Sequence, residues 1–194
     1  MKPPHTLTDV ELMLYADAHV KYEYRMLIVT TGILRAMSGE PPVDDITWAV
    51  KNGLLNTFAV HARTLIDFLY SRVDGKDKPT DVIVQDYVDE AVVAQRLAPK
   101  TSLLKDAVFK AGKQVAHLTK ERMDYEREGK QWLFMDIALD IASAFRSVAP
   151  YVGPTRMSNQ LRSTLERDSV EFPQVDVRRI LSSGDVPCGL SLAL

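Results

Sequence analysis

The chain has almost no cysteine and no excess of charge of either sign. Cys188 is its one thiol, so no intramolecular disulfide can form, and we expect a reducing compartment such as the cytoplasm. The 24 Lys and Arg residues are balanced by 26 Asp and Glu, which gives a formal net charge of −2. Non-specific nucleic-acid binding is typical of strongly basic surfaces, so the composition gives that class no support.

Long hydrophobic runs are absent as well. Charged residues interrupt every apolar stretch before it reaches the ~20 residues that a membrane span needs, and the polar N-terminal segment predicts no signal peptide. The nine glycines form no phosphate-binding loop of the Walker or Rossmann type. We therefore expect no membrane segment and no bound cofactor.

What the chain does have is helical periodicity. Hydrophobic residues make up 46% of its 194 residues, enough for the core of one domain over residues 1–168, followed by a tail over 169–194 that is extended or loosely docked. Apolar positions recur every three or four residues, and short breaks with Pro and Gly separate the periodic segments. The expected helices cover 8–38, 46–72, 103–127 and 131–149, with shorter ones near 87–97 and 157–167. This pattern predicts an all-α fold, an up-down antiparallel bundle of about four to five main helices with an irregular C-terminal tail.

Two of these helices have clear signals of their own. Thr8 and Glu11 fit a capping box that starts the first helix. The predicted core face of that helix consists of Leu12, Tyr15, His19, Tyr22, Met26, Val29 and Ile33. The predicted core positions of the 131–149 helix are Trp132, Met135, Leu139, Ala142 and Phe145.

The 46–72 helix is apolar around much of its circumference and yet contains several polar groups. At ~100° per residue, Asn52, Asn56, Arg63 and Asp67 share one side of it. Arg63 and Asp67 are four residues apart and suit a surface ion pair. The alternatives are an anion-binding or catalytic stripe and a contact between subunits.

His61 lies on the opposite, apolar side of the same helix. If the first two helices form an antiparallel hairpin, His61 is level with Tyr22 and close to His19 and Glu23. One interpretation is a buried neutral histidine with a single hydrogen-bond partner. The other is a metal site, since His19, Glu23 and His61 are a plausible ligand set.

A second polar cluster is in the 103–127 helix. His117 is at the polar margin of that helix, whereas Arg122 continues its apolar stripe. A charge in such a position needs a carboxylate, because an unpaired buried charge is costly, and Asp67 or Glu23 could supply it. The cluster is therefore either an inter-helix ion pair or part of a functional pocket.

The runs NxFxxHARTLIDFLY, in the 46–72 helix, and VAHLTKER, in the 103–127 helix, resemble patterns of bacterial all-helical proteins similar to the HEPN superfamily. The resemblance spans about residues 8–150. It implies a helical bundle, a homodimer, and a role as an RNA-cleaving toxin, a defence protein or a non-catalytic relative. Catalytic members have an Arg followed a few residues later by a His. Here His117 and Arg122 have four residues between them and stand in the reverse order.

Two functional hypotheses follow. The first is a non-catalytic interaction module that forms a homodimer, with RNA or another protein as further partner. The second is a HEPN-like, metal-independent ribonuclease in which His117, Arg122, His61 and Arg63 act on a phosphate, with a His as general acid or base and an Arg on the phosphate.

Overall fold

The computed structural model describes residues 6–38, 44–115 and 132–175, and within these ranges every regular element is a helix. The predicted all-α fold is confirmed. The α-helices are α1 (Asp9–Tyr15), α2 (Lys21–Ala36), α3 (Asp45–Tyr70), α4 (Glu90–Arg96), α5 (Ser102–Lys110), α7 (Phe134–Val148) and α8 (Asn159–Leu165). Two π-helical turns, η1 (Ala16–Val20) and η3 (Ala111–Val115), and two 3₁₀ turns, η2 (Val84–Asp86) and η4 (Ala149–Tyr151), complete the described elements.

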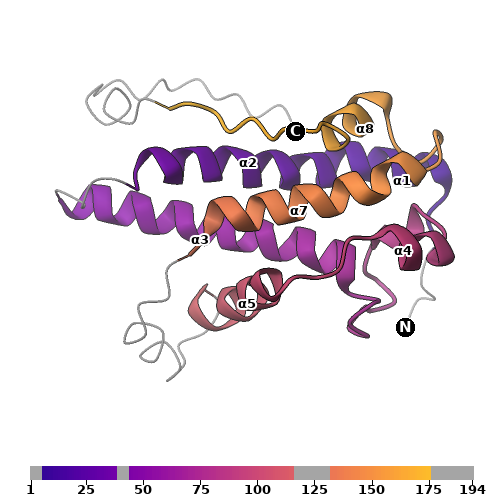
Figure 1. Ribbon diagram of the computed structural model, residues 1–194, viewed down its shortest axis with the longest axis horizontal. Helices are drawn as coiled ribbons and strands as arrows, with labels where there is room; N and C mark the ends of the chain where they lie inside the picture. The colour runs from indigo at the N-terminus through magenta and orange to yellow at the C-terminus, as the bar shows by residue number, and fades with distance from the viewer. Residues whose placement is uncertain (1–5, 39–43, 116–131, 176–194) are drawn as a thin grey trace.

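Four long segments run up and down beside one another (Figure 1). The continuous helix made of α1, η1 and α2 runs one way, α3 returns, α5 runs parallel to α2, and α7 returns again. The most extensive packing is between α2 and α3. Short α4 closes one end of the bundle, and α8 lies across α2 and α7.

The ends of the helices follow their capping residues. The Thr8 hydroxyl accepts from the Glu11 amide at 3.3 Å, and the Glu11 carboxylate accepts from the Thr8 amide at 2.8 Å, so the predicted capping box is present. The Asp44 carboxylate accepts from the Thr47 amide at 2.7 Å and starts α3. The predicted 87–97 helix exists only as α4, which a 3₁₀ turn precedes.

The buried face of the first helix differs from the predicted one. The residues at its core are Leu12, Ala16, Val20, Tyr24, Leu27, Thr31 and Leu34. The π-helical turn η1 is the reason: it holds more residues than an α-helical turn and so rotates α2 relative to α1. Tyr22, predicted for the core, is half exposed. On α7 the predicted core residue Leu139 is also largely exposed, since the buried face of that helix consists of Ile137, Ile141, Phe145 and their neighbours.

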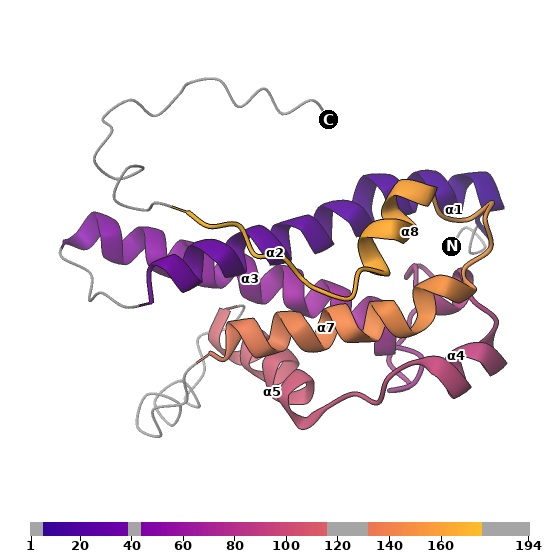
Figure 2. The same cartoon turned by 45° about the horizontal axis from the view of Figure 1, so that its top comes forward.

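The chain that follows α8, residues 168–175, forms an extended segment that we call the C-terminal strap. It crosses α2, as Figure 2 shows, and its Val170 and Phe172 pack on the core. Pro173 lies so close to Gly32 of α2 that a Cβ at Gly32 would be 2.7 Å from the Pro173 carbonyl oxygen. The start of the predicted tail is therefore docked; residues 176–194 lie outside the described part of the chain.

Candidate functional site

The polar centre of the bundle is the contact between Glu23 of α2 and His61 of α3. Their Oε2 and Nδ1 atoms are 2.6 Å apart, and His61 is only 8% exposed. An ionised carboxylate can only accept, so Nδ1 carries the proton in this contact. The Tyr22 ring meets the His61 ring edge-on, with 5.7 Å between centroids. The predicted proximity of His61 to Glu23 and Tyr22 is thus observed, and the contact fixes how α2 and α3 align.

Next to this contact is a pocket of about 490 Å³, which we call the acidic pocket. Its walls come from the end of α1, from η1 and α2, from the second half of α3 and from the 78–83 segment. Its lining residues are Tyr15, His19, Val20, Glu23, Thr64, Leu65, Asp67, Phe68, Ser71, Lys78, Thr80, Asp81, Val82 and Ile83. The π-helical turn brings His19 to the rim, and π-helical turns recur at functional sites in proteins.

The charge of this pocket is mostly negative. Glu23, Asp67 and Asp81 are opposed by one lysine, Lys78. Asp81 caps its own turn by accepting from the Lys78 amide at 3.0 Å. Such a lining favours cationic groups and repels phosphates.

The three predicted metal ligands do not converge. His19 and Glu23 both line the acidic pocket, but His61 is not part of its wall. The His19 ring packs on Tyr15, with 4.6 Å between centroids, while Glu23 binds His61. Within residues 6–38, 44–115 and 132–175, no three or more His, Cys, Asp and Glu side chains form a group that could hold a metal ion. The metal-site hypothesis of the sequence is corrected on this geometry.

The predicted polar stripe of α3 faces solvent. The Arg63 Nε atom is 3.5 Å from the Asp67 Oδ2 atom, the loose surface ion pair that the spacing predicts. The Asn52 side chain donates to the Trp48 carbonyl at 2.8 Å, and Asn56 is exposed. Of these four residues only Asp67 lines the acidic pocket, and a shared site of the four stays a prediction.

Two further predicted residues, His117 and Arg122, lie outside the described residues. The ion pair expected between Arg122 and Asp67 or Glu23 lies outside them too. Both carboxylates have another partner in the described structure, Arg63 and His61 respectively.

The outward side of α3 carries a feature that the sequence reasoning missed. An uncharged row, which we call the α3 stripe, recurs at steps of four and three residues. It consists of Ile46, Val50, Gly53, Thr57, Val60 and Thr64. Ile46, Val50 and Val60 are 72%, 40% and 51% exposed. The available signal was this second apolar periodicity on a helix whose other side already supplies the core.

Both threonines of the α3 stripe are bonded within their own helix. Thr57 donates to the Gly53 carbonyl at 2.8 Å and Thr64 to the Val60 carbonyl at 3.0 Å. Their methyl groups therefore contribute to the surface more than their hydroxyls do. A Cβ at Gly53 would have nothing within 4 Å, so the middle of the stripe is open.

Comparison with known proteins adds no relative: no family model, no curated protein and no solved structure matches the chain. The resemblance to the HEPN superfamily stays a prediction. In the described part of the chain, no helix has both the length and the hydrophobicity to cross a bilayer.

Proposed function

We propose that the protein is a non-catalytic interaction module that acts as a homodimer, with the α3 stripe at its interface. The observation that carries this proposal is a row of six uncharged residues on the long helix α3, five of them exposed and Thr57 partly buried. Large exposed apolar side chains in a continuous row are typical of protein–protein contact surfaces.

A second copy of this chain is the occupant that the stripe suits best. Successive residues of the α3 stripe are separated by four, three, four, three and four positions, and this spacing is the same in either chain direction. An antiparallel α3 from a second copy, related by a two-fold axis near Leu55, therefore places every stripe residue opposite another stripe residue. Val50 meets Val60, and Gly53 meets Thr57, so the smallest residues are at the axis, where two helices approach most closely.

Charge supports the same arrangement. A two-fold interface brings each surface against itself, so an uncharged stripe avoids repulsion between identical charges. In the antiparallel alignment, Arg63 faces the start of the second α3, where Asp45 provides an opposite charge. Asn56 lies close to its own copy beside the axis, and amide side chains can both donate to and accept from one another.

The size of the surface is adequate. From Ile46 to Thr64 the stripe is about 27 Å long, at ~1.5 Å per residue. The half-exposed Tyr22 of α2 lies beside it, since its ring contacts His61. A surface about two helices wide covers on the order of 600 Å², close to the ~800 Å² per partner of a standard interface.

The oligomeric state in solution tests this proposal. By sedimentation velocity at several concentrations we expect a dimer for the wild type and a monomer for Val60→Arg, because two arginines then meet an apolar partner surface. Val73→Arg is the matched control: Val73 is 63% exposed and follows the end of α3. A monomeric wild type at ~100 µM, or a dimeric Val60→Arg, would refute the α3 interface.

Ribonuclease activity is the competing class, and incubation with single-stranded RNA separates the two. The negative lining of the acidic pocket and the engagement of His61 by Glu23 support the non-catalytic proposal. We expect no cleavage by the wild type. RNA cleavage that His117→Ala abolishes, with the fold retained, would establish the enzyme instead. We also propose that the protein works in the cytoplasm, on the basis of its single cysteine.

A further inference from the structure

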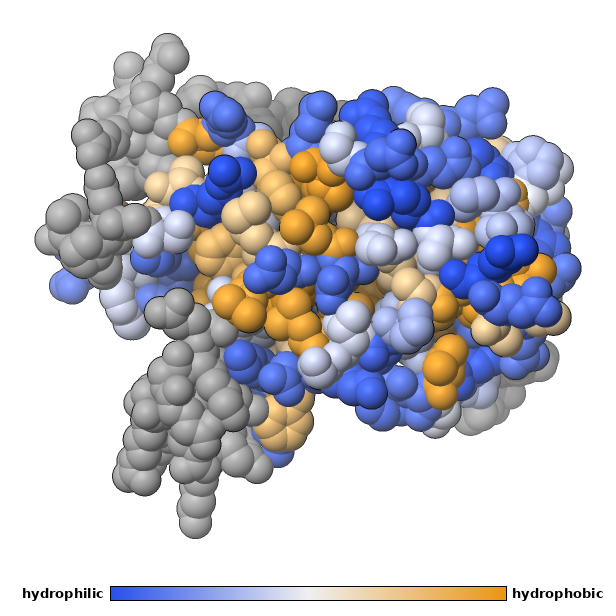
Figure 3. Space-filling view, viewed as in Figure 1, coloured by the Kyte–Doolittle hydropathy of each residue, from blue (hydrophilic) through white to orange (hydrophobic). Residues whose placement is uncertain are grey.

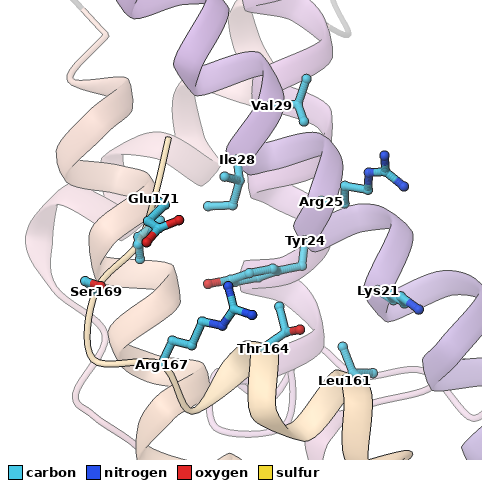
Figure 4. A pocket seen from close by; sticks show the side chains of 11 residues that line it. Lys21, Tyr24, Arg25, Ile28, Val29, Leu161, Thr164, Arg167, Ser169 and Glu171 are labelled. Atoms are coloured by element: carbon cyan, nitrogen blue, oxygen red, sulfur yellow. The ribbon is translucent and has the colours of Figure 1, made fainter. Parts of the chain in front are cut away.

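A second pocket, of about 300 Å³, lies between α2, α8 and the C-terminal strap, and we call it the strap pocket (Figure 4). Three aliphatic side chains contribute to its lining, Ile28 from α2, Leu161 from α8 and Val170 from the strap. In Figure 3, hydrophilic side chains gather over α8 and the beginning of the strap, and hydrophobic ones over the neighbouring α2 and α7. The pocket thus lies where a polar and an apolar surface meet.

Tyr24 is the key polar group of the strap pocket. It is only 7% exposed, and its hydroxyl makes no hydrogen bond to any residue that the structure describes. Figure 4 shows this hydroxyl directed into the pocket, toward the side from which Arg167 enters. The hydroxyl is not among the fully buried polar atoms that lack a partner, so it is open to the pocket and available to donate to a ligand there.

Tyr24 is a donor at neutral pH. Burial raises the pKa of its hydroxyl, and the nearby Arg146 and Arg167 only oppose that rise. A hydroxyl that stays protonated can donate to an anion. Arg167 can add charge-assisted hydrogen bonds, since its guanidinium forms no ion pair with any described residue.

The charges of the lining favour an anion. Lys21, Arg25 and Arg167 provide three positive charges, against one negative charge on Glu171. Lys21 donates to Gln160 at 2.9 Å, and Figure 4 shows Lys21 and Arg25 on the outer side of α2, away from Tyr24. They contribute a positive field, whereas Tyr24 and Arg167 are placed for direct contact.

We propose that the strap pocket binds a small alkyl carboxylate, with its carboxylate on Tyr24 and Arg167 and its chain along Ile28, Leu161 and Val170. The volume sets the length of the ligand. At ~30 Å³ for one water-sized group, about 300 Å³ holds roughly ten non-hydrogen atoms, the size of octanoate. A pocket of this size is at the lower end of small-molecule sites.

Titration calorimetry with octanoate tests the site. We expect one equivalent to bind with a dissociation constant on the order of 100 µM, as suits a ligand of ten atoms. Octanol and octylammonium, which share the chain and lack the carboxylate, should bind at least about tenfold more weakly, because one strong charge-assisted contact is lost. Inorganic phosphate should not compete, since it has no chain to bury.

Two variants locate the ligand. Tyr24→Phe keeps the ring and removes the hydroxyl, and Arg167→Gln removes the charge; each should weaken octanoate binding about tenfold or more. Lys76→Gln, in the exposed turn after α3, is the control and should bind as the wild type does. Circular dichroism verifies the fold of each variant.

Several results would overturn the proposal: no binding of octanoate at 1 mM (about tenfold above the expected constant), equal binding of octanol, or undiminished binding by Arg167→Gln. Octanoate binding is also to be measured on Val60→Arg. The strap pocket shares no residue with the α3 stripe, so that variant should bind octanoate normally. The outcome is therefore independent of the homodimer.

Discussion

The Glu23 carboxylate and the His61 ring, 2.6 Å apart, join α2 to α3 at the centre of the bundle. We expect Glu23→Ala to lower the free energy of unfolding by about 1–3 kcal/mol, because it leaves a buried histidine without its partner. The measurement is urea denaturation followed by circular dichroism. Arg63→Ala is the matched control. It breaks the exposed ion pair with Asp67, one turn away on the same helix, and should cost less than about 0.5 kcal/mol. If both variants lowered the free energy of unfolding by the same amount, the Glu23–His61 contact would stabilise the protein no more than an exposed ion pair does.

The two-fold arrangement of α3 predicts which residues of the two copies meet. With the axis near Leu55, two copies of residue 56 are about 3 Å apart along the helix, and two copies of residue 49 about 18 Å. In a Cys188→Ser background, Asn56→Cys should therefore give a covalent dimer with a short bismaleimide, read on a denaturing gel. Ala49→Cys, at a position that is also exposed, should give little. Strong cross-linking at residue 49 alone would contradict this axis.

The contact between Gly32 and Pro173 makes the strap sensitive to a single methyl group. Gly32→Ala places a Cβ 2.7 Å from a backbone oxygen, so the strap must move. We expect a loss of about 1–2 kcal/mol, despite the higher helix propensity of Ala, and weaker octanoate binding because one wall of the strap pocket shifts.

Gly53→Ala is the matched control for that experiment, since a Cβ at Gly53 meets nothing within 4 Å. It should raise the stability by about 0.5–1 kcal/mol. Both variants are to be compared by urea denaturation in the Val60→Arg background, so that dissociation of a dimer does not contribute. A Gly32→Ala variant as stable as Gly53→Ala would mean that the strap is not held at this point.

Alkaline pH should unfold the protein in a defined window. Burial raises the pKa of Tyr70 to about 12, and its hydroxyl donates to the Ala98 carbonyl at 2.8 Å. The unfolded chain ionises near the ordinary pKa of about 10. Stability is therefore full below pH 10 and decreases from there toward pH 12, because the unfolded state loses its proton first. Tyr70→Phe should flatten this decrease, measured by urea denaturation at several pH values. A variant with an unchanged slope would assign the effect to other groups.

The helices could be predicted from the sequence because their signals are local. Thr8 with Glu11 and Asp44 with Thr47 are caps within one turn, and the breaks with Pro and Gly are equally local. The Glu23–His61 contact followed from the same reasoning, since a hairpin of two regular helices fixes which residues are level with each other.

The buried face of α2 could not be predicted in this way. A π-helical turn such as η1 has no reliable sequence signal, and one such turn was enough to replace Tyr22 and Met26 with Tyr24 and Leu27 at the core. The strap pocket was missed for a different reason. Arg167 is 143 positions beyond Tyr24, and only the folded chain places α8 and the strap over α2.

The turn η1 divides one continuous helix into two halves that contact different parts of the protein. On one side of it, Asp9 binds Arg156 at 2.8 Å and the Leu12 carbonyl accepts from the buried Tyr87 hydroxyl. On its other side, Tyr24 and Leu27 belong to the bundle. In a regular α-helix the chain would turn by ~1,200° between Leu12 and Tyr24, about 120° beyond three full turns, so the wide turn η1 is what keeps both residues on the buried face. Deleting one residue between 16 and 20 would leave a regular helix in which these two residues still share a face, whereas inserting one more would turn α1 by ~100° against α2. The spare residue thus keeps the two halves of the helix in phase, and this position should tolerate a deletion better than an insertion.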